Sequence, residues 1–573
     1  MPASRDSSDV AIIGGGLAGL CLGLQLKGRR PDTSVVVLEK HTGRAPEAAH
    51  KVGESTAEVA AHYFGSVVGM QDHLDEVQYR KAGLRFYFTK GDNSDISTRV
   101  EFGPTRTSPT PTYQLDRGIF ENELMDRARA AGVEVLDGAR VEDADVETAP
   151  HTVTFKHAGE PQTVSARWVV DAAGRAFFLK RKLGLLKDAE HNVNSAWLRL
   201  ANGLDFEEWS DNEEWLARMP ERGIRRRGTT QLMGKGYWLW LIQLASGPIS
   251  IGICCDPRIH PWEQFQNVDG FIDWCNRFEP QLGEELTRRR DEILDYLKVS
   301  HFSYDAERVY SPDRWALVGE AGPFADPLYS PGSDFIAMGN TFVTDLVARD
   351  LDGEDIDDRL EYFNRFLLDV FERYLILYTD SYLLMGNTQA MGIKHSADVC
   401  AYWGETALAY IHGDWTDLDF LQQIEPSLAR TKQLLTRLHA FYHEWNELEP
   451  DQDLPGMILP RPGPATVGER LFELIKPDHD KATIAPKIEA NSLQYESLLV
   501  LIFHKVATRL TPDPRLEDEN ARYNPYAISL DPDRWESDGL FGNDEHPGIT
   551  LAEANERFVG FDRIWLEELP SAV

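Results

Sequence analysis

A glycine pattern near the beginning of the chain carries the clearest chemical signal in the sequence. Gly14, Gly16 and Gly19 follow the spacing G-x-G-x-x-G, in which the first glycine permits a turn and the second lets the backbone approach a pyrophosphate. The third lets the following helix pack closely on a strand, and the free amides at the start of that helix attract phosphate. Glu39 ends the next apolar run, where a carboxylate can hold ribose hydroxyls. The pattern predicts a dinucleotide site, and the alternative is a glycine-rich turn with a purely structural role.

The segments around these glycines have the pattern of a strand, a helix and a second strand. Residues 9–13 and 34–38 are short, apolar and β-branched, as buried parallel strands are. Two later apolar runs have the same character and end in small-residue turns at residues 171–174 and 319–322. The sequence therefore predicts an α/β fold with a Rossmann-like nucleotide-binding domain.

Two local patterns outside this unit also predict structure. Ser55 and Glu58 match a capping box, so a helix is expected to begin near Ser55. Residues 90–112 are rich in Asp, Ser, Thr and Pro, so they are expected to form a loop. From about residue 341 the periodicity becomes that of helices.

Composition and charge exclude several classes of protein. The chain has 573 residues, with 59 Lys and Arg against 93 Asp and Glu, which gives a formal net charge of −34. Such a polyanion repels phosphate backbones and anionic lipids, so binding to nucleic acid or to a membrane is not expected. The five cysteines are few and odd in number, and no Cys or His spacing fits a metal site, so neither a disulfide scaffold nor a bound metal is expected. The first residues lack a secretory signal pattern, which predicts a cytoplasmic protein.

Three short segments resemble those of FAD-binding monooxygenases with the p-hydroxybenzoate hydroxylase type of fold. They are the turns at residues 171–174 (DAAG) and 319–322 (GEAG) and the segment at residues 114–117 (QLDR). The resemblance implies that the dinucleotide is FAD and that Arg117 belongs to its site. It also implies that the second turn meets the flavin ribityl and pyrophosphate region, with Glu320 where the group usually has aspartate. The alternative for Arg117 is a surface charge at the start of a helix.

Three further segments narrow the resemblance to flavin-dependent halogenases. Residues 51–56 (KVGEST) resemble the Gly-Glu-Ser strap that contacts the flavin. Residues 236–243 (GYWLWLIQ) resemble the family's Trp-x-Trp-x-Ile-Pro signature, with Gln243 in place of the proline. Residues 324–332 (FADPLYSPG) resemble its Phe-x-Asp-Pro-Leu-x-Ser-x-Gly segment. The segments occur in the family's order, and the resemblance covers residues 9 to about 350.

The resemblance implies roles for residues of the first two segments. Gly53, Glu54 and Ser55 are expected to contact the flavin. Trp238 and Trp240 alternate along a predicted strand, where they are expected to wall the route between flavin and substrate and to exclude monooxygenation. The alternative, with equal weight, is that the two tryptophans only pack the sheet.

Lys81 occupies the place of the family's catalytic lysine, just before a predicted strand and after the first long helix. The resemblance implies that reduced flavin, O2 and halide yield hypohalous acid. A buried ammonium can hydrogen-bond this species, or the amine can form a haloamine, and either route directs electrophilic halogen to an electron-rich ring. The alternative is a solvated lysine, because the neighbours Arg80 and Arg85 give the local sequence the character of a surface.

The third segment raises the question of the halide. In the family, backbone amides after the serine hold the halide, but Pro331 has no N–H. Ser330 and Gly332 remain as candidates. Tyr329 stands where the tryptophan-halogenating branch has a glutamate that can accept the ring proton, whereas the phenol- and pyrrole-acting branches have an aromatic residue there. The chain therefore resembles those branches more.

Together these features predict two parts. Residues 1–345 are expected to form an FAD-binding core with an interleaved, mainly antiparallel substrate sheet, and residues 346–573 a mainly helical region with an acidic, irregular tail. The first hypothesis is a halogenase that uses reduced FAD, O2 and chloride or bromide on a phenolic or pyrrolic substrate, either free or tethered to a carrier protein. Because only one dinucleotide fingerprint is present, a separate flavin reductase is expected to supply reduced FAD.

Two alternative hypotheses keep the bound flavin but not the halogenation reaction. Pro331, Gln243 and Glu320 depart from the halogenase pattern and motivate an FAD-dependent monooxygenase or oxidase of the same fold. A flavin-binding protein without turnover, acting as a redox sensor or interaction module, is the third hypothesis.

Overall fold

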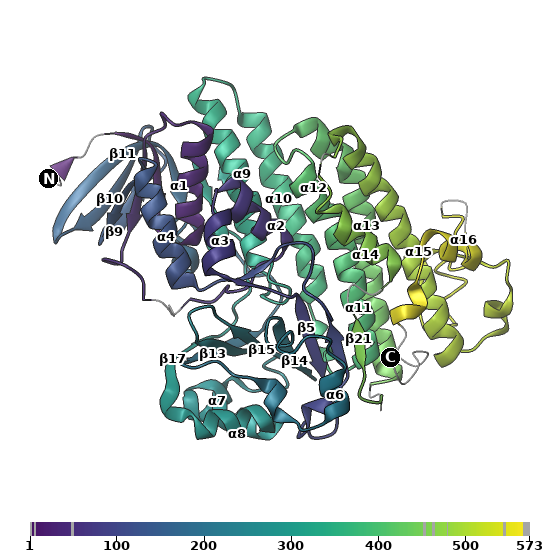
Figure 1. Cartoon of the computed structure of the whole chain (residues 1–573). Helices are drawn as coiled ribbons and strands as arrows, with labels where there is room; N and C mark the ends of the chain where they lie inside the picture. Colours follow the sequence, from purple (N-terminus) through teal and green to yellow (C-terminus); the bar gives the residue numbers. More distant parts are fainter. Residues whose placement is uncertain are drawn as a thin grey trace.

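The computed structural model shows two large sheets and a group of long helices beside them (Figure 1). It describes residues 3–4, 7–46, 51–450, 454–460, 464–477, 479–542 and 546–564. One sheet lies near the N-terminus with helices α1 (Leu17–Arg29) and α4 (Arg117–Ala130) beside it. The other sheet lies below these helices in the view of Figure 1. The C-terminal helices lie at the right of this view, on the side of the molecule opposite the first sheet.

The first sheet contains the predicted nucleotide-binding unit. Its main path runs in the order β19-β20-β11-β2-β3-β8, and β20, β11, β2, β3 and β8 are mutually parallel neighbours. The bounds are β2 (Ser8–Ile13), β3 (Val35–Glu39), β8 (Glu134–Asp137), β11 (Glu160–Asp171), β19 (Tyr310–Ser311) and β20 (Trp315–Leu317). The hairpin of β10 (His151–His157) and β11, flanked by β9 (Arg140–Asp145), extends the sheet, and β1 (Ala3–Ser4) pairs with β11. The predicted order of strand, glycine turn, helix and strand is confirmed by β2, α1 and β3.

The second sheet is mainly antiparallel and is built from segments interleaved with the first. Its strand order is β17-β13-β16-β15-β14-β5-β6-β21, in which only the pairs β14–β5 and β6–β21 are parallel. The bounds are β5 (Leu84–Phe88), β6 (Glu101–Gly103), β13 (Asn194–Leu200), β14 (Thr229–Gly234), β15 (Tyr237–Gln243), β16 (Ile249–Cys255), β17 (Ile293–Val299) and β21 (Ile458–Pro460). Helices α7 (Val268–Phe278) and α8 (Pro280–Arg288) lie beneath it in Figure 1.

The expectation of a continuous loop over residues 90–112 is wrong. Residues Ile96–Thr98 form a short 3₁₀ turn, and β6 pairs with β5 inside this stretch. The strand forms because Phe102 packs on Phe86 of β5, with ring centroids 6.1 Å apart. The Glu101 carboxylate, moreover, is held by two buried arginines, Arg85 and Arg225.

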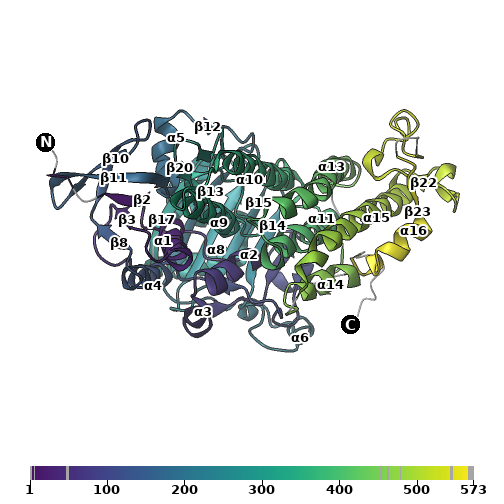
Figure 2. The same ribbon diagram turned by 90° about the horizontal axis from the view of Figure 1, so that it is seen from above.

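The C-terminal part is a set of packed helices, as the periodicity predicts. The long helices are α9 (Gly332–Leu351), α10 (Asp357–Tyr378), α11 (Thr388–Ala401), α13 (Leu418–Leu448) and α15 (Ile484–Leu510). Seen from above in Figure 2, α15 runs alongside α13 and α11, and the shorter α14 (Ala465–Glu473) lies next to them. Helix α9 packs on α1 of the nucleotide-binding unit, and β21 from the C-terminal half closes the second sheet. The division at residue 345 falls within α9 and stays a prediction.

Several short helices complete the described part of the chain. They are α2 (Glu58–His62), α3 (Gln71–Val77), α5 (Phe178–Lys182), α6 (Glu213–Ala217), α12 (Leu408–His412) and α16 (Leu551–Arg557). In the predicted acidic tail, the described residues form short turns, the two-stranded pair of β22 (Arg522–Tyr523) and β23 (Ile549–Thr550), and α16. Residues 543–545 and 565–573 of that tail lie outside the described residues.

The capping box predicted at Ser55 is wrong. Helix α2 begins at Glu58, and its N-cap is Ala57, which has no side chain able to cap. Ser55 instead lies in an isolated bridge with Gln114. The reason is that Ser55 is hydrogen-bonded across the fold to residues distant in sequence.

Within the described ranges, no helix combines the length and the apolar character that a bilayer span requires. All five cysteines are buried free thiols.

Candidate functional site

The glycine turn after β2 has the geometry that a pyrophosphate requires. Gly14 has a φ of +108°, and a Cβ built on Gly19 would lie 2.1 Å from the Gly14 carbonyl oxygen, so neither position accepts a side chain without movement. A Cβ on Gly16 would meet only the Lys51 ammonium, at 4.0 Å. Gly16 is also the N-cap of α1 and makes no side-chain cap, so the first amides of the helix face this cradle. The cradle fits a pyrophosphate.

Glu39 stands at the end of β3, beside the turn. Its Oε2 accepts a hydrogen bond from the Gly15 amide over 2.7 Å, and its Oε1 accepts one from the His41 amide over 2.8 Å. These bonds fix the carboxylate next to the glycine cradle, where it can also accept from ribose hydroxyls. Glu39 therefore lies where the sequence places it, at the end of the second strand and next to the glycine turn at Gly15.

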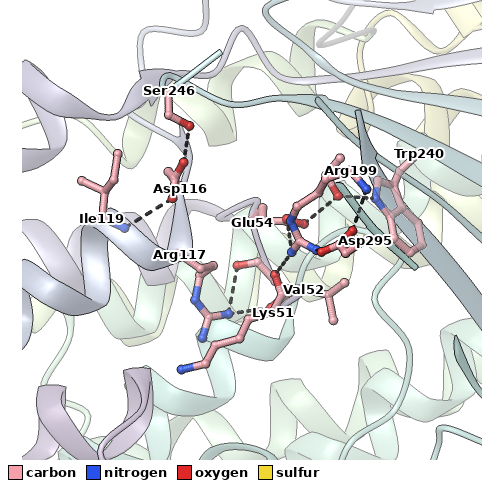
Figure 3. Close-up of polar contacts among 12 residues, drawn as sticks. Lys51, Val52, Glu54, Asp116, Arg117, Ile119, Arg199, Trp240, Ser246 and Asp295 are labelled. Atoms are coloured by element: carbon pink, nitrogen blue, oxygen red, sulfur yellow. Dashed lines mark hydrogen bonds and ion pairs between the residues drawn. The ribbon is translucent and has the colours of Figure 1, made fainter. Parts of the chain in front are cut away.

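The strap at residues 51–55 is fastened to the second sheet through Glu54 (Figure 3). The buried Glu54 carboxylate accepts from Arg199 Nη2 over 2.8 Å and from Ser250 Oγ over 3.0 Å. Arg199 in turn bonds Asp295 over 2.9 Å and also donates to the Lys51 carbonyl. Burial raises the pKa of Glu54, and the positive charge of Arg199 opposes that effect. Glu54 thus anchors the strap through its carboxylate, which is fully occupied by protein partners.

Arg117 approaches the same strap from the start of α4. Its Nη1 donates to the Val52 carbonyl over 2.6 Å, and its guanidinium pairs with Glu121 one turn along the helix, as Figure 3 shows for the strap contact. Gly53 has a φ of +89°, and a Cβ there would lie 2.8 Å from Arg117 Nη1. The side chain is 12 % exposed, so it is not the surface charge of the alternative interpretation. Arg117 therefore supports the strap.

Lys81 is buried, contrary to the interpretation of a solvated lysine. It is 3 % exposed and lies between β4 (Tyr79–Arg80) and β5. Its Nζ donates to Ser55 Oγ over 2.8 Å and to the Thr56 carbonyl over 3.0 Å. The surface-like character of the local sequence is misleading because Arg85 is itself 0 % exposed and paired with Glu101.

Lys81 lines a cavity of about 380 Å³, a volume suited to a small organic molecule. The cavity is also lined by Glu58, Tyr329, Tyr402, Trp403 and Phe472. A smaller cavity of about 60 Å³ adjoins it, since Ala57, Tyr329, Val399 and Tyr402 line both. The walls thus come from residues 56–58 just after the strap, the β4–β5 connection, residues 104–112, Tyr329 of the 324–332 segment and the C-terminal helices.

Asp326 holds the 324–332 segment in place. Its Oδ1 accepts from the Leu328 amide over 2.8 Å, and its Oδ2 accepts from Tyr382 Oη over 2.7 Å and lies 2.9 Å from His191 Nε2. Trp238 Nε1 donates to the same Tyr382 hydroxyl over 2.9 Å. The Trp-x-Trp segment and the 324–332 segment are therefore joined through Tyr382, which the sequence analysis did not single out.

The backbone of the 324–332 segment turns sharply before α9. Tyr329 and Ser330 have φ values of +70° and +67°, which non-glycine residues adopt only under constraint. The Ser330 amide donates to the Pro327 carbonyl over 2.9 Å, and Pro331 is the N-cap of α9. Because Pro331 has no N–H, Gly332 provides the first backbone amide at the N-terminus of α9. The Tyr329 hydroxyl points to the C-terminal helices, where it donates to Asp398 over 3.1 Å.

Trp238 and Trp240 lie on one face of β15 with ring centroids 5.6 Å apart. Trp240 Nε1 donates to Ser250 Oγ, which bonds Glu54. They are 3 % and 5 % exposed and are absent from the described lining of the Lys81 cavity. Gln243, which replaces the expected proline, donates to the carbonyls of Leu244, Gly247 and Pro248 and so closes the turn after β15.

The turn that contains Glu320 lies at the end of β20, parallel to the end of β11. The Tyr304 hydroxyl donates to the Glu320 backbone carbonyl over 2.8 Å. Beneath this turn lies Lys180, which sequence reasoning missed. Its ammonium donates to the Gly322 carbonyl and lies 4.4 Å from the centre of the Tyr304 ring, and burial lowers its pKa to about 7.

Two buried carboxylates near the cavities were also missed. Asp334, in the first turn of α9, accepts from the Ala60 amide over 2.9 Å and from Tyr402 Oη over 2.8 Å. Burial raises its pKa to about 7. Asp398 pairs with Lys394 over 2.6 Å, and burial raises its pKa while Lys394 opposes the shift. Helical periodicity shows that such positions are buried, but it carries no signal that they meet Tyr402 or Tyr329.

Comparisons with known proteins show which proteins this chain resembles. Residues 7–250 match the family model described as an FAD binding domain. The flavin-dependent halogenase chlA of Dictyostelium discoideum is 27 % identical over 439 residues, which cover 70 % of each chain. A 1H-pyrrole-2-carbonyl-[peptidyl-carrier protein] brominase of Pseudoalteromonas luteoviolacea is 25 % identical over 358 residues, covering 61 % of this chain and 79 % of the brominase. The crystal structure of halogenase PltM has a TM-score of 0.60 at 16 % identity, with 86 % of this chain and 97 % of that chain covered.

Proposed function

We propose that this FAD-dependent oxidoreductase, which is similar to flavin-dependent halogenases, halogenates an electron-rich aromatic substrate through Lys81. The observation that carries the proposal is the buried Lys81 ammonium in the wall of a cavity of about 380 Å³. The strap that holds this ammonium through Ser55 is the segment that Arg117 and Glu54 fasten in place.

The chain's own residues form a cofactor site of consistent chemistry. The turn that Gly14 and Gly19 permit and the free amides that follow Gly16 at the start of α1 suit the pyrophosphate, and Glu39 suits the ribose hydroxyls. The flavin end is assigned to the backbone of Gly53 and Ser55 in the strap and to the turn of Glu320, with Arg117 in support. Bound reduced FAD supplies the electrons that, with O2 and halide, give hypohalous acid.

Lys81 acts on that acid in the cavity. Its ammonium donates a hydrogen bond to the oxygen, which makes the halogen more electrophilic, or its neutral amine accepts the halogen as a haloamine. Ser55 Oγ and the Thr56 carbonyl fix the direction of Nζ, so the halogen is delivered to one position of a bound ring.

The halide is assigned to the turn before α9. Pro331 lacks an N–H, and the Ser330 amide is used by the Pro327 carbonyl, so the Gly332 amide and the Ser330 hydroxyl are the proposed donors. The helix N-terminus at Gly332 favours an anion there.

The substrate class is phenolic or pyrrolic. Tyr329 in the cavity wall, in place of a glutamate, supports this assignment, as does the brominase relative named for a pyrrole carbonyl on a carrier protein. The substrate is either free or carrier-tethered, a separate flavin reductase supplies reduced FAD, and the protein acts in the cytoplasm.

A second candidate, an FAD-dependent monooxygenase or oxidase of the same fold, is favoured by one observation. Pro331 sits at the N-cap of α9, where an amide donor to halide is expected. In that case the cavity would hold an aromatic substrate that receives oxygen instead of halogen.

The test needs no knowledge of the natural substrate. The protein is supplied with FAD, a flavin reductase, NADH, O2 and chloride or bromide, and a panel of phenols and pyrroles is analysed by mass spectrometry. Enzyme-dependent halogenated product is the expected result. Oxygenated product without halogen, at both halides, would replace the halogenase proposal with the monooxygenase.

A further inference from the structure

Aromatic halogenation releases one proton from the ring for each halogen added. Tyr329 occupies the position where a related branch has a glutamate, and its hydroxyl is turned away to Asp398. The other polar side chains in the wall of the Lys81 cavity are therefore the next candidates for a proton acceptor.

Glu58 is the carboxylate in that wall. It is the first residue of α2, is partly buried, and lines the same cavity as Lys81. Its carboxylate forms no hydrogen bond or ion pair with any residue in the described part of the chain. A carboxylate whose oxygens accept no hydrogen bond from the protein, and which lines a cavity, is suited to accept a proton from a bound molecule.

The other buried carboxylates nearby are committed to protein partners. Asp334 accepts from the Ala60 amide and Tyr402 Oη, and it lines only the smaller cavity. Asp398 is paired with Lys394 and accepts from Tyr329. Tyr402, which lines both cavities, stands between Glu58's cavity and Asp334.

We propose that Glu58 is the general base that takes the proton lost by the aromatic ring, an inference that rests on the proposed halogenase function. The ring carbon uses its π electrons to bond the halogen of hypohalous acid, and the oxygen–halogen bond breaks. The departing hydroxide takes a proton from the Lys81 ammonium and leaves as water. The ring carbon then gives its proton to the Glu58 carboxylate, and the C–H electron pair restores aromaticity. Glu58 afterwards returns this proton to the Lys81 amine, which resets both groups.

The assignment predicts a kinetic signature that a merely structural role would not produce. With a fast base, loss of the ring proton follows halogen addition rapidly, so a ring-deuterated substrate reacts at the same rate as the protiated one. In Glu58→Gln, proton loss becomes the slow step. Aromatic halogenation is expected to fall by about 10²-fold, in the range typical of a lost general base, and a primary isotope effect is expected to appear.

The experiment compares a phenol with its ring-deuterated form in the holoenzyme with reductase, O2 and bromide. Hypohalous acid formation is measured separately by trapping with a small 1,3-diketone and is expected to be unchanged in Glu58→Gln. Glu76→Gln, an exposed glutamate of α3 outside the cavity, is the matched control and is expected to behave as wild type. Glu58→Asp keeps the carboxylate, so it is expected to recover part of the rate and to show a smaller isotope effect than Glu58→Gln.

Three results would overturn the proposal. One is a Glu58→Gln variant that halogenates at the wild-type rate without an isotope effect. Another is an isotope effect that appears in Asp334→Asn and not in Glu58→Gln, which would make Asp334 the acceptor through Tyr402. The third, no halogenated product from wild type, would refute the proposed function itself, whereas the first two would refute only the role of Glu58.

Discussion

The ammonium of Lys81 donates a hydrogen bond to Ser55 Oγ over 2.8 Å. Ser55 belongs to the strap proposed to contact the flavin, and Lys81 lines the proposed substrate cavity, so this hydrogen bond joins the two proposed sites. The Thr56 carbonyl adds a second bond to the same ammonium. A displacement of the strap is therefore expected to move Lys81, the lysine proposed to direct the halogen.

Ser55→Ala is expected to lower aromatic halogenation by about tenfold or more, because hydrogen bonds to charged groups contribute about 1.5–3 kcal/mol. Hypohalous acid formation is expected to change less, since FAD is held mainly by other residues. Both rates are read in the coupled assay with the diketone trap. Thr229→Val removes the other hydroxyl that contacts Ser55 at 3.0 Å without touching Lys81, and it serves as the control. Equal losses in the two variants would contradict a specific role for the Ser55–Lys81 bond.

Gly19→Ala is expected to destabilise the nucleotide-binding unit and to weaken FAD binding severely. The new Cβ would lie 2.1 Å from the Gly14 carbonyl oxygen, so the helix must move away from the turn. Gly28→Ala on the same helix meets nothing within 4 Å, and it is expected to be neutral or slightly stabilising by helix propensity. Thermal unfolding and FAD titration measure both. Wild-type FAD affinity in Gly19→Ala would show that the pyrophosphate lies elsewhere.

Asp334 is expected to make stability depend on pH in a defined direction. Its pKa in the folded protein is about 7, above the ordinary value of 3.8, because the side chain is buried. The stability linked to its proton is fully present below pH 3.8 and is lost as the pH rises to about 7. Relative to Asp334→Asn, wild type should therefore lose stability over this window, by roughly 4 kcal/mol at most.

Urea unfolding at several pH values checks the Asp334 prediction, with the exposed Asp358→Asn as control. A difference between wild type and Asp334→Asn that stays constant from pH 4 to pH 8 would refute the raised pKa.

Glu101→Gln is expected to destabilise the fold by about 3–5 kcal/mol, because it leaves Arg85 as a buried cation without its carboxylate partner and leaves Arg225 only its longer ion pair with Glu207, at 3.4 Å. Since Arg85 belongs to β5, just after Lys81, halogen transfer should fall together with stability. Chemical unfolding gives the free energy, and Glu76→Gln is the exposed control. A decrease of less than 1 kcal/mol in the free energy of unfolding would mean that the Glu101 ion pairs are not desolvated in solution.

The nucleotide-binding unit was predictable because its information is local. The turn, the helix start and Glu39 depend on residues within a single strand–helix–strand segment, and each occupies the expected place. The mainly antiparallel second sheet also followed from strand alternation together with the resemblance. Helical periodicity was sufficient for α10, whose Leu360, Phe363 and Leu367 are buried.

The environment of Lys81 was not predictable from its neighbours. Arg85 looks exposed in the sequence, but Glu101 neutralises it from another strand. Ser55 and Glu58 match a helix cap, yet Ser55 bonds Lys81 and Glu58 faces the cavity. Such pairings depend on contacts between segments distant in the chain, which local patterns do not encode.

The most direct test of the account compares Lys81→Ala with wild type in two assays run side by side. Formation of hypohalous acid is followed with the diketone trap, and halogenation of a phenol is followed by mass spectrometry. Lys81→Ala is expected to bind FAD and to form hypohalous acid, but to lose aromatic halogenation by more than 10²-fold. Aromatic halogenation at the wild-type rate and position in Lys81→Ala would contradict the proposed role of Lys81.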